Sequence, residues 1–209
     1  MLIKTTKSLF RGMYQYKAVL VCSGAHWFRS GDMDSAIENL KKVDLSTNDA
    51  RGSWRPLIKT KEDLDYSIKL AKQIKKISGI DIRVESPYIS IYSNNKSDID
   101  SLTKIDTDRV KYISVPPTNN VLVENTILMP KINFDYRVTL GKTTAKHDAF
   151  ISWAEGTSKL KLTKSCKRDL TKDRSWGGTH FYITGDNMLL MAKMHLGGSI
   201  NKVERIIKA

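Results

Sequence analysis

The chain has 209 residues, with 35 lysines and arginines against 22 aspartates and glutamates, so its formal net charge is +13. Hydrophobic residues make up 40% of it, and the 12 glycines and 5 prolines are ordinary numbers, which excludes disordered, collagen-like and low-complexity chains. No apolar run reaches the roughly 18 residues of a membrane span, and residues 1–11 contain no apolar stretch of signal-peptide length. We therefore expect a cytoplasmic protein without a membrane partner.

In the first half, alternating and apolar residues predict strands, and helical spacing behind a capping residue predicts helices. Asp32 or Asp34 caps a short helix with Met33, Ile37 and Leu40 on one face, and Thr60 with Asp63 starts a longer one. Lys69, Lys72, Lys75 and Lys76 lie on the solvent side of that second helix. Residues 46–53 have loop composition. The expected elements are a strand at Tyr14–Cys22, helices at 32–43 and 63–77, strands at Ile80–Val84 and Tyr88–Tyr92, a helix at Asp98–Ile105 and a strand at Val110–Val115.

The pattern of strands and helices is interrupted at Pro116 and Pro117, which are followed by Thr118, Asn119 and Asn120. This segment is the best candidate for a linker. We expect two domains, residues 1–117 and 118–209. The second is expected to begin with Val121–Leu128 and then to hold a strand at Phe134–Leu140, a helix at Asp148–Trp153, a strand at Thr157–Leu162, a basic loop, a strand at Thr179–Thr184, a helix at Asn187–Leu196 and a strand at Ile200–Ile207.

The order of these elements is βαββαβ, which predicts an α+β protein of two ferredoxin-like halves with antiparallel sheets and helices on one face. The other face of each sheet would be open. Tyr16–Leu20 is similar to Tyr136–Leu140, and residues 87–115 match residues 180–207 in their sequence of elements. These similarities suggest a duplication.

The high positive charge favours a polyanionic partner, and nucleic acid leads because the sequence holds no basic amphipathic helix for a membrane surface. The alternative is that the charged side chains are simply hydrated at the surface and bind no specific partner. The densest basic segment runs from residue 159 to 178, where cations in a Ser/Thr-rich loop could contact phosphates and a tryptophan could stack on an unpaired base. The candidate binding residues are Lys159, Lys161, Lys164, Lys167, Arg168, Lys172, Arg174 and Trp176, with Trp27 and Arg29 as a second patch.

Several strands carry aromatic residues: Tyr14, Tyr16, Tyr88, Tyr92, Tyr112, Phe181 and Tyr182. RRM-type modules stack RNA bases on aromatic residues of a ferredoxin-like sheet, and the expected fold is similar to theirs, but their aromatic signature is absent here. Tandem ferredoxin-like halves on a basic chain also resemble CRISPR repeat-associated RNA-binding and RNA-processing proteins. Their glycine-rich stretch is matched at most by Gly197-Gly198, which a helix C-cap explains. The sequence is therefore assigned to no family.

Catalysis is the second hypothesis. A metal-independent ribonuclease needs a base for the ribose 2′-hydroxyl, an acid for the leaving oxygen and a cation for the phosphate. His180, next to the basic segment, is the best candidate, and His26 is the second; each is also explained by packing, His180 as a strand-end residue half covered by Trp176. Asp32, Asp34 and Glu38 could offer carboxylates to a metal, but helix capping explains them, and we expect no metal and no cofactor.

Motifs of NTPases, nicotinamide enzymes, serine hydrolases and zinc proteases are absent. Cys22, expected in a strand, and Cys166, expected in the basic loop, match no zinc or disulfide spacing. The sequence thus predicts a non-catalytic nucleic-acid-binding protein. The alternatives are an RNA-processing nuclease and a structural protein of a virus or phage, which would form homo-oligomers or meet assembly partners in the host cytoplasm or virion.

Overall fold

A computed structural model describes residues 2–45, 58–117 and 122–208. The expected loop at 46–53 and residues 118–121, which include part of the expected linker, lie outside this range. The chain divides into two compact units, Met1–Val121 and Leu122–Ala209. In the described residues no helix combines the length and the apolar character needed to cross a membrane.

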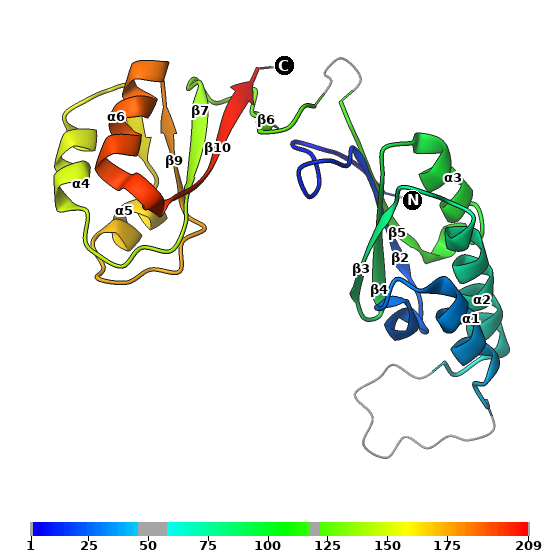
Figure 1. Cartoon of the computed structure of the whole chain (residues 1–209). Helices are drawn as coiled ribbons and strands as arrows, with labels where there is room; N and C mark the ends of the chain where they lie inside the picture. Colours follow the sequence, from blue (N-terminus) through cyan, green and yellow to red (C-terminus); the bar gives the residue numbers. More distant parts are fainter. Residues whose placement is uncertain (1, 46–57, 118–121, 209) are drawn as a thin grey trace. The chain divides into compact units, whose positions relative to one another are not determined.

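The described residues of unit 1 form one five-stranded sheet and three α-helices (Figure 1). Its elements are β1 (Ile3–Thr5), β2 (Tyr16–Val21), α1 (Met33–Lys41), α2 (Lys61–Lys75), β3 (Asp81–Glu85), β4 (Tyr88–Ser93), α3 (Lys96–Thr103) and β5 (Val110–Val115), with short 3-10 helices at Ala25–Phe28 and Thr107–Arg109.

The helices of unit 1 begin at the capping residues that the sequence indicates. Asp32 accepts hydrogen bonds from the backbone amides of Asp34 and Ser35, and Thr60 accepts one from the amide of Asp63 at 3.1 Å. These side chains satisfy amides that have no partner inside the helix. The four lysines expected on the solvent side of α2 are all exposed.

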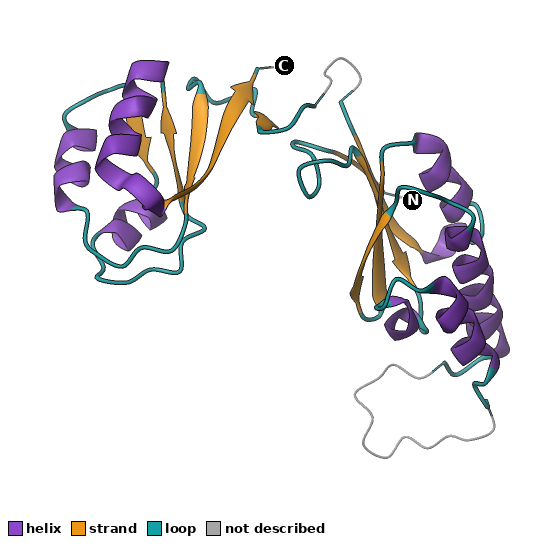
Figure 2. Ribbon diagram, in the orientation of Figure 1, coloured by secondary structure: helices purple, strands orange, loops and turns teal. Residues whose placement is uncertain are grey.

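The strand order in unit 1 is β1-β5-β2-β4-β3. The four strands from β5 to β3 pair antiparallel, whereas β1 pairs parallel to β5. All three α-helices lie on one side of this sheet (Figure 2). The core between helices and sheet is apolar and includes Leu20, Leu70, Ile89, Ile91 and Leu102.

Unit 2 repeats this arrangement, with the order β6-β10-β7-β9-β8, and β6 again parallel to its neighbour. Its elements are β6 (Thr126–Leu128), β7 (Tyr136–Leu140), α4 (Asp148–Glu155), β8 (Leu160–Leu162), α5 (Lys164–Leu170), β9 (His180–Ile183), α6 (Asp186–Leu196) and β10 (Ile200–Ile207), with a 3-10 helix at Gly197–Ser199. The core between the helices and the sheet includes Val138, Phe150, Phe181, Ile183 and Leu196.

The chain is thus a mixed α+β protein with two five-stranded sheets and six α-helices in its described part. Two expectations are wrong. The sheets are not wholly antiparallel, because each has a fifth, parallel strand at one edge. The basic segment is not a continuous loop either, because residues 164–170 form helix α5.

Candidate nucleic-acid interface

The ten predicted binding residues are divided between the two units. Trp27 and Arg29 belong to unit 1, and the other eight belong to unit 2, where they divide among three elements. Lys159 and Lys161 lie just before and on the edge strand β8, and α5 carries the next three cations, Lys164, Lys167 and Arg168. The last three residues, Lys172, Arg174 and Trp176, follow α5 in a segment that leads to β9.

Helix α5 forms because, despite its polar composition, it has a capping residue and a pair of buried apolar residues. Thr163 accepts a hydrogen bond from the amide of Cys166 at 3.2 Å, and its hydroxyl donates to the carbonyl of His180 at 2.6 Å. Cys166 and Leu170, one turn apart, are both fully buried in the core. Cys166 is therefore not in a loop, and burial raises the pKa of its thiol to about 12.

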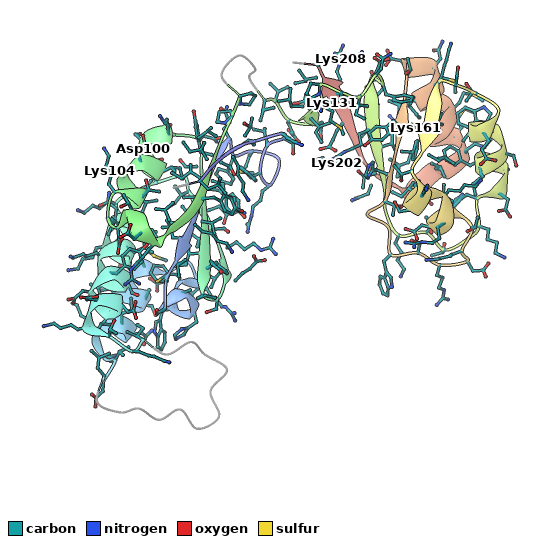
Figure 3. The ribbon with its side chains drawn as sticks, turned by 180° about the vertical axis from the view of Figure 1, so that it is seen from behind. Asp100, Lys104, Lys131, Lys161, Lys202 and Lys208 are labelled. Atoms are coloured by element: carbon teal, nitrogen blue, oxygen red, sulfur yellow. The ribbon has the colours of Figure 1, made fainter. Side chains whose placement is uncertain are left out.

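The cations of α5 face away from that core and are exposed. Lys167 forms an ion pair with Glu155 at the end of α4, so part of its charge is already compensated. Lys161 pairs with Tyr182 across the sheet, on the face without helices. Lys161 and Lys202, both labelled in Figure 3, come from β8 and β10.

The segment after α5 is held by backbone pairing. Thr143 and Ser175 exchange two backbone hydrogen bonds of 3.0 and 3.1 Å, and the amide of Gly178 donates to the carbonyl of Leu140 at 2.8 Å. Residues 141–146 and 172–178, which we call the tip of unit 2, therefore extend the sheet beyond β7 and β9. Gly177 makes this possible: its φ is +78°, and a Cβ there would lie 2.2 Å from the carbonyl oxygen of Gly141.

Trp176 projects from this tip with 90% of its surface exposed. The only cation over its ring among the described residues is Lys142, whose Nζ lies 5.5 Å from the ring centroid. Lys142 was not predicted as a site residue. It could have been suspected from the basic sequence that directly follows a buried strand, but its position opposite Trp176 depends on long-range pairing.

The tip carries three further cations besides Lys142. Arg174 is exposed and forms no ion pair in the described part of the chain, and Lys146 has only a long contact, 3.8 Å, to Asp173. Lys172 pairs with Asp169 at 3.3 Å. Burial alone would raise the pKa of Asp169, but the Lys172 ammonium keeps that pKa below its ordinary value. The tip thus combines an aromatic platform with positive charge.

The second predicted patch, Trp27 and Arg29, has no exposed ring comparable to Trp176. Trp27 lies in the 3-10 helix at Ala25–Phe28, is partly buried and packs against the core of unit 1. Its ring contacts that of His26 at 4.4 Å between centroids. Arg29 is exposed, but its aromatic neighbours in the described sequence, Trp27 and Phe28, are partly or fully buried. Phe28, between Trp27 and Arg29, is buried almost completely.

His180 lies on β9, on the sheet face that carries no helices. Its Nε2 lies 3.1 Å from the hydroxyl of Tyr182, and burial followed by the nearby Arg137 charge lowers its pKa. Trp176 does not cover it, since that side chain is almost fully exposed. On the same face Glu204 is 1% exposed and accepts hydrogen bonds from Arg137 and Lys202.

The two aspartates considered as metal ligands have structural partners. Asp32 caps α1, and Asp34 forms an ion pair with Lys75. Within the described ranges, no group of three or more His, Cys, Asp and Glu side chains is arranged to hold a metal ion. Cys22 follows β2 rather than lying in it, and its thiol is 3.3 Å from the hydroxyl of Ser67.

Comparison with protein-family models, with curated proteins and with solved structures finds no match for this chain. The function must therefore be argued from the chain's own residues.

Proposed function

We propose that the protein binds single-stranded nucleic acid, with Trp176 at the tip of unit 2 stacking on a base. The observation that carries this proposal is the 90% exposure of Trp176 on a segment fixed by backbone hydrogen bonds. Stacking on a ligand would remove this exposed apolar ring from water, which is favourable. Bases offer a flat π-face to such a ring, whatever their sequence.

The charges of the tip indicate which ligand covers the ring. The tip carries four cations, Lys142, Lys146, Lys172 and Arg174, against one exposed carboxylate, Asp173, and Lys142 lies over the Trp176 ring. A strand that stacks one base on Trp176 brings its phosphates to these cations. In a duplex the base faces are already stacked on each other, so a single strand fits the tip better.

We also propose that each unit is a ferredoxin-like fold with one added edge strand. The support is the antiparallel order β5-β2-β4-β3 with helices on one face, which unit 2 repeats as β10-β7-β9-β8. This split βαβ order leaves one sheet face open. Nucleic-acid binding does not depend on this assignment.

Titration of fluorescent oligonucleotides with the full chain tests the proposal. Trp176→Ala is expected to weaken binding of single-stranded DNA or RNA by about 5- to 100-fold, since a stacked base contributes about 1–3 kcal/mol. An oligonucleotide of the same length without bases should not distinguish this variant from the wild type. Leu190→Ala, which removes an exposed apolar side chain on α6, is the matched control and should change nothing.

The charge contribution is tested separately. Lys172→Glu with Arg174→Glu should weaken binding of every sequence and reduce the salt dependence, because fewer counterions are released. Lys72→Glu with Lys76→Glu on α2 makes the same change of charge elsewhere. Equal losses from both pairs, or no loss from Trp176→Ala, would refute the tip as the site. If the wild type shortened the probes and the His180→Ala variant left them intact, the protein would instead be a nuclease.

A further inference from the structure

The open face of the sheet in unit 1 carries a second set of aromatic and basic side chains. Ala18 and Leu20 of β2 and Ile89 and Ile91 of β4 point into the core below the helices. Because side chains alternate along a strand, the residues between them face the other way. That face includes Lys17 on β2 and Tyr88 and Tyr92 on β4, and neighbouring strands add Lys4, Lys111 and Tyr112.

On this face each lysine lies against a tyrosine ring. Lys4 Nζ is 3.9 Å from the ring centroid of Tyr112, and Lys111 Nζ is 3.7 Å from that of Tyr88. Lys17 Nζ lies among three rings, 5.5 Å from Tyr92, 5.6 Å from Tyr112 and 5.7 Å from Phe10. We call these three lysines and three tyrosines the tyrosine–lysine face.

The three ammonium groups are held in place without being neutralised. No ion pair joins Lys4, Lys17 or Lys111 to a carboxylate in the described part of the chain. A tyrosine ring attracts a cation through its quadrupole but carries no net charge. The long side chains therefore lose conformational freedom on folding, while their full charge stays available to an anion.

The tyrosine rings themselves are not available for stacking. Tyr92 is 5% exposed and is covered by Phe10 and Tyr14, whose ring centroids lie 5.6 and 6.1 Å away. Tyr88 and Tyr112 are half-buried, with lysines over their rings. This face therefore suits phosphates rather than bases, in contrast to the exposed ring at the tip of unit 2.

We propose that the tyrosine–lysine face is a second binding site, which holds the phosphodiester backbone of a single-stranded nucleic acid without reading its sequence. This inference rests on the proposed function, since the ligand is the same. Tyr88 and Tyr92 are four residues apart on β4, which places their backbones about 13 Å apart along the strand, with Lys111 over the first ring and Lys17 beside the second. An extended strand can bring successive phosphates to both.

The test uses full-chain variants and two probes that contain no bases, an abasic oligonucleotide and inorganic polyphosphate. Lys4→Ala, Lys17→Ala and Lys111→Ala together should weaken binding of both probes and reduce the log–log salt slope for the oligonucleotide by about 2, at about 0.7 per phosphate contact. Lys69→Ala, Lys72→Ala and Lys76→Ala remove the same charge from the exposed side of α2 and serve as the control. Equal losses from both triple variants would overturn the site.

A second variant separates the effect of holding the lysines in place from the effect of their charge. Tyr88→Leu with Tyr112→Leu leaves the net charge unchanged but removes the rings that hold Lys111 and Lys4. Affinity for the abasic probe should fall about two- to fivefold, the equivalent of 0.5–1 kcal/mol for an exposed cation–π contact. The corresponding Phe variants keep the rings and should bind normally. Unchanged affinity in a folded Leu variant, checked by thermal unfolding, would overturn the role of the rings.

The outcomes distinguish this site from the tip. If Trp176→Ala loses affinity for normal oligonucleotides while the lysine variant binds like its control, the tip stands and the tyrosine–lysine face is refuted. If the wild type binds polyphosphate through the three lysines but no oligonucleotide, the proposed function fails and the face is an anion site for another ligand. Tighter binding to phosphatidylserine vesicles than to any nucleic acid would refute the proposed ligand.

Discussion

Glu204 is a buried carboxylate held between two cations on the open face of unit 2. It is 1% exposed and accepts hydrogen bonds from Arg137 at 2.8 Å and from Lys202 at 2.9 Å. Glu204→Gln leaves both cations without their counter-charge, and partial exposure of the cations limits the penalty. We expect a loss of about 2–3 kcal/mol in the free energy of unfolding, measured by urea denaturation.

The same substitution elsewhere provides the control for Glu204. Glu85 forms an ion pair with Arg83 in which both side chains are more than half exposed. Such surface pairs contribute about 0–1 kcal/mol, so Glu85→Gln should have little effect. Similar losses from both substitutions would show that burial of Glu204 does not determine its contribution.

His180 makes the stability of unit 2 depend on pH. Burial and the Arg137 charge lower its pKa in the folded protein below the ordinary value of 6.5. The unfolded chain therefore binds a proton at a higher pH than the folded one, and stability is lost as the pH falls below 6.5 towards the folded-state pKa. In thermal unfolding between pH 5 and 7, the wild type should lose more stability on acidification than His180→Asn. Parallel curves for the two proteins would contradict this.

At the scale of elements, the tip depends on a close approach of two backbones at Gly177. Gly177 and Gly178 both have positive φ, +78° and +83°, but only at Gly177 would a Cβ meet another atom, the carbonyl of Gly141. Gly178→Ala should cost about 1 kcal/mol from backbone strain alone. Gly177→Ala should cost clearly more, and hydrogen exchange at Thr143 and Ser175 should accelerate. Equal losses of stability from the two substitutions would mean that the two segments of the tip can move apart without cost.

The sequence predicted the elements whose determinants are local. Asp32 and Thr60 cap helices where expected, and the strands at Val110–Val115 and Ile200–Ile207 have the expected limits. Helix α5 was missed because its lysines dominate the composition, although Thr163 was available as a cap. Strand β1 was missed as well, since three exposed residues form it only by pairing with β5.

The two proposed binding surfaces also depend partly on local sequence and partly on long-range pairing. An exposed tryptophan among cations was predicted at Trp176, and the structure places it at a tip whose partner, Lys142, comes from another segment. The contacts between Lys4 and Tyr112 and between Lys17 and Tyr92 depend on the register of neighbouring strands. No spacing in the sequence could have indicated them.

At the scale of the whole molecule, the two units share strand order and strand direction. The similar segments Tyr16–Leu20 and Tyr136–Leu140 form equivalent strands, β2 and β7. Their second residues even have equivalent neighbours, since Lys17 is opposite Tyr92 and Arg137 is opposite Tyr182. We infer that the units arose by duplication and then diverged, one placing lysines on tyrosine rings and the other burying an ion-pair network.

The two proposed binding surfaces predict that affinity depends on the length of the ligand. A single strand long enough to contact both units binds the second surface as an intramolecular event, which raises affinity without any new contact. We expect oligonucleotides of increasing length to show a step of at least about tenfold, in titrations at constant salt. Either Trp176→Ala or the triple lysine variant should remove the step, because each leaves one surface. If affinity instead rose smoothly with oligonucleotide length in the wild type and in both variants, a single surface would account for all the binding.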